Sequence, residues 1–250
     1  MDKKKIIKNI VITGAGSGIG KETAELFLKN GYKVALIGRR IEALSRTANQ
    51  NINAMIIPCD ISNYNEVKKS FLKIYKKYKK IDILFNNAGI SNKAGTIDEI
   101  PIKEWVKAVN TNLLGSFYCA REAFRIMRLQ KPQGGRIINN GSISAHSPRP
   151  LSSSYTSTKH AITGLTKSIA LDGRKFNIAC CQIDIGNAKS KLTKKMNRGI
   201  KQASGLIKKE PTFETKHVAK SIFYISELPL DVNIQFMTLM STKMPYIGRG

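Results

Sequence analysis

Acidic residues are scarce in this chain. Its 250 residues include 17 Asp and Glu against 42 Lys and Arg, which gives a formal net charge of +25. Such an excess is compatible at first sight with a polyanionic partner. Yet 42% of the residues are hydrophobic and only 24% are charged, so the chain has enough apolar surface to fold. The composition excludes a disordered basic tail and predicts a globular protein of a length suited to one α/β domain.

Long hydrophobic runs and cysteines are also scarce. No stretch reaches about 18 consecutive apolar residues, so we expect no membrane span. The segment from Met1 to Lys8 leads into no apolar region of the kind that a secretory signal needs, and we expect a cytoplasmic protein. No cysteine belongs to a Cys-x-x-Cys pair, and reduced thiols are expected. The four cysteines are Cys59, Cys119, Cys180 and Cys181.

Histidine is rarer still. His146, His160 and His217 are scattered without metal-ligand spacing, so the sequence predicts no metal site. Ser142 and His146 would be candidates for a hydrolase pair, but no G-x-S-x-G elbow surrounds the serine. A serine hydrolase is therefore disfavoured.

What the chain does contain is an alternation of short apolar runs with stretches of helical period, which is typical of βαβ units. The whole chain, 1–250, is predicted to be one doubly wound parallel β-sheet domain flanked by helices, a Rossmann fold. Strands are expected at 9–13, 32–37, 54–58, 81–85, 136–139 and 178–185. The polar, lysine-rich stretch 187–214 is expected to leave the sheet, and we interpret it as a substrate lid.

Three helical stripes are expected to face the sheet. The first lies in the lysine-rich helix that ends near Lys80, and the others lie in helices over 105–127 and 155–171. Their members are, in order, Val67, Phe71, Ile74 and Tyr78; Val106, Val109, Leu113, Phe117 and Phe124; and Ala161, Leu165 and Ile169.

A glycine-rich turn follows the first expected strand. Residues 13–20 read TGAGSGIG where a strand passes into a helix, so backbone N–H groups and the positive helix end can face a pyrophosphate. The spacing of Gly14, Gly18 and Gly20 departs from the usual G-x-G-x-x-G fingerprint. Taken alone, glycines of this kind are often only turn residues.

The turn resembles the amino-terminal motif of the short-chain dehydrogenase/reductase family. Further matches follow in family order. Residues 86–89 read NNAG, Asn112 matches a helix asparagine, Ser142 precedes Tyr155 by thirteen residues, and residues 155–159 match the YxxxK signature with Lys159. The ordered resemblance spans roughly residues 9 to 190.

The resemblance implies a catalytic set of Asn112, Ser142, Tyr155 and Lys159. Tyr155 would act as general acid and base, Ser142 would hold the substrate oxygen, and Asn112 would hold a water in a proton relay to Lys159. On a helix the i, i+4 pair Tyr155 and Lys159 shares one face, so the ammonium can lie close to the phenol and favour its ionised form. Taken alone, a tyrosine and a lysine at this spacing are more often two neighbours on the protein surface.

The resemblance also implies a nicotinamide cofactor, with NADP(H) preferred and NAD(H) as the alternative. Gly38 stands where NAD users commonly carry aspartate, and Arg39 with Arg40 can read a 2′-phosphate, although a pair of solvated arginines is the other reading. The expected cofactor-binding residues are Gly14, Ser17, Gly18, Ile19, Gly20, Arg39, Arg40, Asp60, Ile61, Asn87, Ala88, Gly89, Tyr155, Lys159 and Ile185.

Two segments depart from the family pattern. Residues 182–188 read QIDIGNA where many members have a Pro-Gly pair, which puts the contact of Ile185 with the nicotinamide amide in doubt. The carboxyl-terminal part lacks the common Asp-Gly-Gly, and the chain resembles a less characterised subgroup.

The sequence thus predicts an NADP-preferring oxidoreductase that interconverts a carbonyl and a secondary alcohol on a small molecule. The alternative within the family is a reductase of 3-oxoacyl thioesters on acyl carrier protein or coenzyme A, suggested by a run of basic residues before Glu210. These are Lys189, Lys191, Lys194, Lys195, Arg198, Lys201, Lys208 and Lys209.

The alternative from another class is a non-catalytic protein that binds a nucleotide or a polyanion. No stripe of interleaved aromatic and basic residues supports it, so no nucleic-acid partner is expected, and no membrane partner either. A homo-oligomer, a dimer or a tetramer, is expected from the family resemblance through the helix of Tyr155 and its long neighbour.

Overall fold

The computed structural model describes residues 8–91, 94–190, 193, 196 and 199–247. Its centre is a seven-stranded sheet in the order β3-β2-β1-β4-β5-β6-β9, and every pairing in it is parallel. The strands are β1 (Asn9–Thr13), β2 (Lys33–Gly38), β3 (Ala54–Pro58), β4 (Ile83–Asn86), β5 (Gly135–Asn140), β6 (Ile178–Gly186) and β9 (Phe236–Met240). The predicted α/β class with a doubly wound parallel sheet is confirmed.

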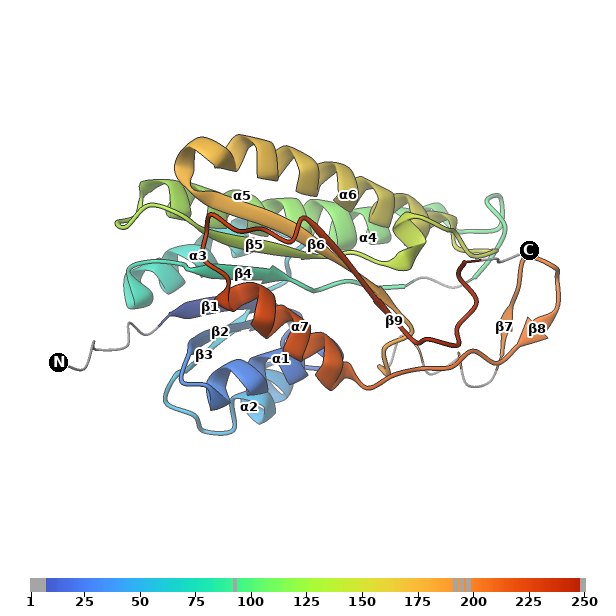
Figure 1. Ribbon diagram of the computed structural model, residues 1–250, viewed down its shortest axis with the longest axis horizontal. Coiled ribbons are helices and arrows are strands. Elements are labelled where there is room, and N and C mark those ends of the chain that lie inside the picture. Colours follow the sequence, from blue (N-terminus) through green and yellow to red (C-terminus); the bar gives the residue numbers. More distant parts are fainter. Residues whose placement is uncertain (1–7, 92–93, 191–192, 194–195, 197–198, 248–250) are drawn as a thin grey trace.

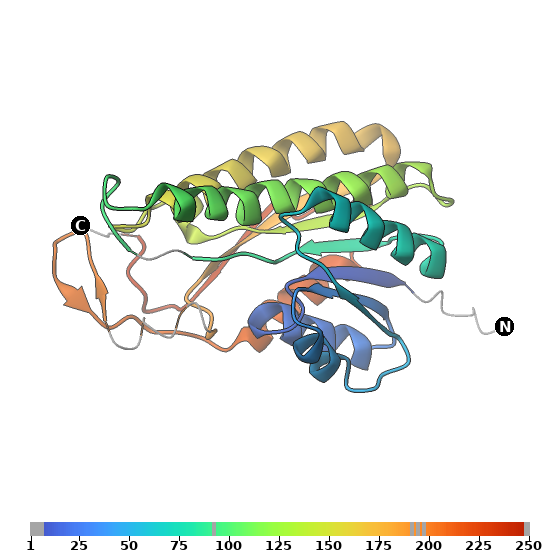
Figure 2. The ribbon, with the colours of Figure 1, turned by 180° about the vertical axis from the view of Figure 1, so that it is seen from behind.

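Helices cover both faces of the sheet (Figure 1, Figure 2). One face carries α1 (Gly18–Lys29), α2 (Ile41–Ala48) and α7 (Thr215–Glu227), and the other carries α3 (Tyr64–Tyr78), α4 (Ile102–Ala108), α5 (Gly115–Leu129) and α6 (Ser153–Gly173). Among the described helices, none is long and apolar enough to cross a membrane.

Each strand contributes side chains to two hydrophobic cores, one on each face of the sheet, because successive side chains of a strand point to opposite faces. In β1, Ile10 and Ile12 pack in the cluster on the side of α1, while Val11 packs in the cluster on the side of α3 and α5. The stripe expected on α3, from Val67 to Tyr78, is buried as predicted. Burial on both faces explains why the strands read as continuous apolar runs.

The stripes expected on the two helices that follow are partly wrong, although Phe124 and Ile169 pack against the core as predicted. The predicted helix over 105–127 divides into α4, a π-helical turn (Val109–Leu114) and α5, and Val106 and Phe117 are exposed. Apart from Ile126 and Met127, the residues that face inward are small or polar, among them Ala108, Asn112, Ser116, Cys119 and Ala123. On α6, Ala161, Leu165 and Ile169 are half-buried, and the fully buried face carries Ser154, Thr158, Ile162 and Thr166. Small side chains let these helices approach the sheet and each other closely.

The seventh strand is absent from the sequence prediction. Strand β9 pairs with β6 from Gln182 opposite Phe236 to Gly186 opposite Met240. Between these strands the chain leaves the sheet, as predicted, and forms the short antiparallel hairpin of β7 (Ile200–Lys201) and β8 (Ile207–Lys208). Figure 1 shows this hairpin projecting beyond the end of the sheet.

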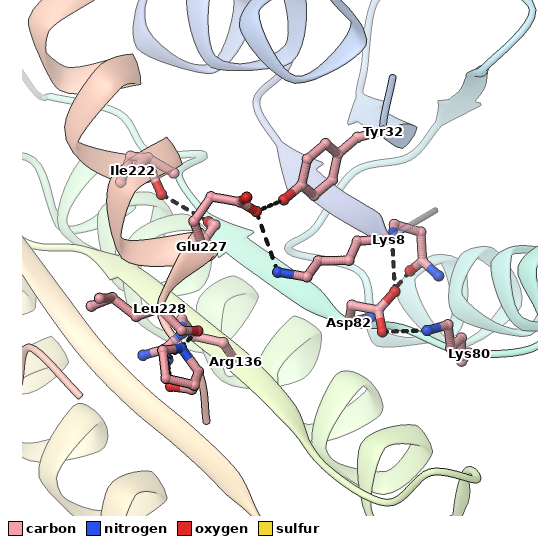
Figure 3. A network of polar contacts seen from close by, with 11 residues as sticks. Lys8, Tyr32, Lys80, Asp82, Arg136, Ile222, Glu227 and Leu228 are labelled. Atoms are coloured by element: carbon pink, nitrogen blue, oxygen red, sulfur yellow. Dashed lines mark hydrogen bonds and ion pairs between the residues drawn. The ribbon is translucent and has the colours of Figure 1, made fainter. Parts of the chain in front are cut away.

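Polar contacts fasten the opposite end of the sheet (Figure 3). Tyr32 donates a hydrogen bond to Glu227, which also pairs with Lys8, and burial followed by this bond raises the pKa of Tyr32. Arg136, whose residue is 1% exposed, donates to the backbone carbonyls of Leu228, Pro229 and Val232 and to Asn233 Oδ1. The guanidinium thereby fixes the segment that leads from α7 into β9.

Candidate functional site

The candidate site lies at the carboxyl ends of the parallel strands, where ligands of doubly wound sheets bind. The glycine-rich turn follows β1, Arg39 follows β2, Asp60 follows β3, Asn87 follows β4 and Ser142 follows β5. Because all these strands run in the same direction, residues far apart in sequence meet at one edge. Two adjoining cavities lie there.

The turn after β1 leaves backbone donors available. Gly14 and Gly18 have φ of +67° and +53°, a conformation that other residues rarely adopt. Ser17 caps α1 without a side-chain hydrogen bond, so the first N–H groups of the helix are available to an anion. Gly20 has another role, because a Cβ there would lie 2.4 Å from the carbonyl oxygen of Gly14. It permits close packing rather than contact with a ligand.

The first cavity, of about 310 Å³, runs from this turn to Tyr155 and Lys159. Of the expected cofactor-binding residues, all but Gly20 and Ile185 line it. Ile185 borders the second cavity instead. A long cavity with a bare backbone turn and cations at both ends, Arg39 with Arg40 and Lys159, fits an elongated dinucleotide with phosphate groups.

At the far end of the first cavity, the two arginines are exposed. Arg39 Nη1 lies 4.0 Å from Asp60 Oδ2, and this contact joins two solvated side chains. Ion pairs between exposed side chains contribute little to stability because water screens both charges. Asp60 also accepts hydrogen bonds from the N–H and hydroxyl of Ser62, at 3.0 and 2.8 Å. The arginine pair is thus open to a further anionic ligand.

Tyr155 lies on α6 and borders both cavities. Lys159, one turn later, is buried, and its Nζ donates to the carbonyl oxygen of Asn140 at 2.6 Å while lying 5.6 Å from the centre of the Tyr155 ring. Asn140 Nδ2 in turn donates to Asn87 Oδ1 at 3.0 Å. The sequence motifs do not indicate the contact between Asn140 and Lys159, because Asn140 accepts that hydrogen bond with its backbone oxygen.

Ser142 lines the second cavity, of about 290 Å³, together with Tyr155. Its hydroxyl oxygen accepts the N–H of Ser144 at 3.1 Å. The hydroxyl proton is therefore left to donate elsewhere. Apolar residues such as Ile143, Leu151 and Ile185 and several serines form much of the remaining wall.

Asn112 lies in the π-helical turn between α4 and α5, a feature often found at functional sites. Its amide accepts from the N–H of Ile90 at 2.8 Å and donates to the Ile90 carbonyl at 3.0 Å and to Thr158 Oγ1 at 3.2 Å. Asn112 thus ties the segment after β4 to α6, and lines neither cavity.

A buried carboxylate supports the turn of Ser142. Asp184, on β6, is fully buried, and its Oδ1 accepts the Ser142 N–H at 2.9 Å and Gln182 Nε2 at 2.7 Å. Its Oδ2 lies 2.8 Å from Nε2 of His146, which is part of the same turn. The sequence reasoning missed this cluster, although the QIDIG departure marked its position.

A second buried carboxylate, Glu210, holds the excursion after β6 against the site. It pairs with Arg149 through both carboxylate oxygens. Lys191, Lys194, Lys195 and Arg198 of the predicted basic lid lie outside the described residues. Within the described residues, no group of three or more His, Cys, Asp or Glu side chains could hold a metal ion.

The fold and the two adjoining cavities define a class of protein: a doubly wound α/β protein with room for a dinucleotide and a small molecule at the carboxyl ends of its strands. The family model that matches the chain, over residues 8–201, is that of the short chain dehydrogenases. The chain belongs to this family. It is an NAD(P)-binding oxidoreductase that acts on CH–OH groups.

Among curated relatives, a 3beta-hydroxysteroid dehydrogenase of Mediterraneibacter gnavus is 33% identical over 198 residues, 78% of this chain and 71% of the relative. A serine 3-dehydrogenase of Rhizobium radiobacter is 28% identical over 241 residues, 96% of each chain. The solved structure of ElxO with NADP bound is 32% identical, with a TM-score of 0.83 and coverage of 94% of this chain and 98% of that one.

Proposed function

We propose that the protein is an NADP-preferring oxidoreductase that interconverts a small-molecule carbonyl and a secondary alcohol, with Tyr155 as general acid and base. The observation that carries this proposal is the position of Tyr155, which borders both cavities, with Lys159 lining the first and Ser142 the second. A proton donor at the junction can reach an oxygen atom of a ligand in the second cavity.

The residues that line the first cavity would hold the nicotinamide cofactor, which supplies the hydride for the carbonyl carbon when it is bound. Tyr155 then donates its proton to the carbonyl oxygen. Ser142 donates a second hydrogen bond to the same oxygen. Its hydroxyl oxygen already accepts the N–H of Ser144, and its hydroxyl proton is available to the substrate. Two donors converging on a developing negative charge lower the barrier. In the direction of oxidation, Tyr155 accepts the alcohol proton.

Lys159 supports this proton transfer. Its ammonium is held by Asn140 beside the Tyr155 ring, which places a positive charge where the phenolate would form. Asn112 makes no direct hydrogen bond to Lys159 in the described structure; its role is to hold the segment after β4 against α6. A relay through Asn112 would need a bridging water molecule.

The NADP preference rests on Gly38, Arg39 and Arg40. We expect higher kcat/KM with NADPH than with NADH, because two exposed cations at the end of β2 can bind a 2′-phosphate. Replacing Arg40 with Ala should raise the KM for NADPH about tenfold and leave that for NADH nearly unchanged. Steady-state kinetics with both cofactors test this, with exposed Arg46→Ala as the matched control. A clear preference of the wild type for NADH would contradict the assignment.

The substrate class can be narrowed with a panel of ketones, sugars and acyl thioesters, scored by the loss of NADPH absorbance. Two of the relatives are named for a hydroxysteroid and for serine as substrates. A solved 3-ketoacyl-(acyl-carrier-protein) reductase from Brucella melitensis, complexed with NADH, has a TM-score of 0.84 to this chain at 25% identity. The acyl-thioester alternative draws on the basic residues of the excursion, of which Lys189, Lys201, Lys208 and Lys209 are described. A binding protein without catalysis would bind NADPH tightly and turn over nothing in the panel.

We also propose that the chain acts as a homo-oligomer, as one domain with residues 187–214 as its substrate lid. The exposed apolar side chains of α4 and α5, among them Val106 and Phe117, support a subunit contact on that side. Light scattering during size-exclusion chromatography would reveal a dimer or a tetramer, and a monomer would contradict the contact. The cytoplasmic location expected from the sequence stays a prediction.

A further inference from the structure

The wall of the second cavity contains an arginine whose charge is already engaged. Arg149 lines this cavity, and its guanidinium donates to both oxygens of Glu210, at 2.5 and 2.6 Å. The side chain of Arg149 is 13% exposed and that of Glu210 is fully buried. Paired, parallel hydrogen bonds of this kind are the strongest that an arginine forms with a carboxylate.

Glu210 has further partners besides Arg149. Asn187 Nδ2 donates to one of its oxygens at 2.7 Å, and Gln202 Nε2 donates to the other at 3.0 Å. Burial alone would raise the pKa of Glu210, but the hydrogen bonds from Arg149, Asn187 and Gln202 lower it below its ordinary value. The carboxylate is thus charged at neutral pH and accepts four hydrogen bonds, which accounts for both of its oxygens.

The pair makes this part of the cavity electrically neutral. The charged side chains among the described residues that line the cavity are Arg149 and Lys201, and Lys201 is exposed on the β7 strand of the hairpin. A substrate carboxylate beside Arg149 would lose its water and meet a guanidinium already bound, with the negative charge of Glu210 behind it. Like charges brought together without water are strongly disfavoured.

We propose that Glu210 is a specificity-determining residue, which neutralises Arg149 and so excludes carboxylate-bearing substrates from the second cavity. This inference rests on the proposed carbonyl reduction in that cavity. It assigns to the site substrates that are uncharged near the reacting carbonyl, such as ketones and keto esters. It also distinguishes the chain from its serine-oxidising relatives, whose substrate is an amino acid.

The test uses matched pairs of keto esters and free keto acids: methyl pyruvate with pyruvate, methyl acetoacetate with acetoacetate, and methyl levulinate with levulinate. The wild type should prefer the esters by about a hundredfold in kcat/KM, and the acids should not inhibit it. Glu210→Gln releases Arg149, and should raise kcat/KM for at least one acid about tenfold or more, the size of one charge-assisted hydrogen bond. The acids should also inhibit this variant competitively.

Glu122→Gln is the matched control, because Glu122 is a buried carboxylate paired with Arg121 and Arg125 on α5, away from both cavities. It should leave the ratio of ester to acid unchanged. The double variant Arg149→Met with Glu210→Gln removes the released guanidinium as well, and should return the ester-to-acid ratio of kcat/KM from that of Glu210→Gln toward that of the wild type. Thermal unfolding of each variant shows whether it is folded.

Three outcomes overturn the inference. In the first, the wild type reduces the acids with the same kcat/KM as the esters, and in the second, the acids inhibit it with a Ki as low as the KM for an ester. The third is a folded Glu210→Gln variant with the same ester-to-acid ratio of kcat/KM as the wild type. The first two need only the wild type, so they apply even if the variant does not fold. If no ketone in any panel is turned over, the proposed function itself fails, which is a different result from an unchanged ratio.

Discussion

At the scale of single residues, the site depends on groups that hold the reacting side chains in place. Asp184 fixes the Ser142 turn at its backbone N–H and at His146. Asp184→Asn keeps the size of the side chain but turns one acceptor into a donor. We expect kcat to fall about tenfold to a hundredfold because Ser142 shifts, while the KM for NADPH changes little.

Exposed Asp172 on α6 provides the control for this substitution, since Asp172→Asn should leave kcat unchanged. Steady-state kinetics measure the effect of Asp184→Asn on kcat, and thermal unfolding measures its effect on stability. A fall in the amount of folded protein with normal kcat per folded molecule would reduce Asp184 to a structural role.

Sequence motifs identify residues of the types that the proposed chemistry needs. They do not identify residues that support the site only through contacts made in the folded structure. Tyr155 and Lys159 share one helix, so their spacing alone places them on one face. Asp184 and His146 are 38 positions apart and meet only because β5 and β6 are neighbours in the sheet. Nothing in the sequence signals the use of the Asn140 carbonyl oxygen.

At the scale of the elements, Arg136 joins β5 to the segment before β9. Burial lowers the pKa of Arg136, and its hydrogen bonds to three carbonyls compensate for that burial. Arg136→Met removes the donor from these three part-buried hydrogen bonds. We expect the free energy of unfolding to fall by about 2 to 4 kcal/mol, measured by urea denaturation.

The control for this substitution is Arg46→Met on the exposed face of α2, which should change the free energy of unfolding by less than about 0.5 kcal/mol. Equal effects of the two substitutions would mean that the carbonyl contacts contribute nothing specific.

The contact between the excursion and the site should depend on pH. The pKa of Glu210 in the folded protein lies below its ordinary value of 4.5, so its pairing stabilises the fold above that pH. The contribution is lost as the pH falls through the folded pKa. Unfolding followed from pH 7 to below 4 should therefore show a loss of stability in the wild type that is smaller in Glu210→Gln. Parallel curves for the two proteins would contradict this linkage.

The helices α5 and α6 explain where hydrophobic periodicity misled the prediction. Large apolar side chains usually mark the buried face. Here Phe117 is exposed while Cys119 and Ala123 are fully buried, since close packing against the sheet selects small residues. The conflict disappears if the large side chains meet a second subunit, as proposed above.

At the scale of the whole molecule, six strands and their parallel direction could be predicted because most of them are buried on both faces of the sheet and read as continuous apolar runs. Strand β9, at one edge of the sheet, was not predicted; Thr238 interrupts its apolar residues, and all of its residues are half-buried or exposed. The hairpin of β7 and β8 has no apolar pattern to reveal it.

The net charge of +25 is also a property of the whole molecule. Many of its lysines lie on solvated helix faces, such as that of α3, where they favour solubility rather than a particular partner. Other charges have a specific contact or a proposed use, among them the proposed 2′-phosphate site of Arg39 with Arg40 at the end of β2, and Arg149, which pairs with Glu210.

In the proposed function, Tyr155 transfers the proton in a nicotinamide-dependent reduction of a carbonyl. The most direct measurement compares wild type and Tyr155→Phe for NADPH oxidation with the best ketone of the panel, alongside NADPH binding followed by fluorescence. We expect the variant to bind NADPH but to lose turnover by about a thousandfold or more, because Tyr155 is the one residue among those described that lines both cavities. Turnover retained in Tyr155→Phe would contradict it.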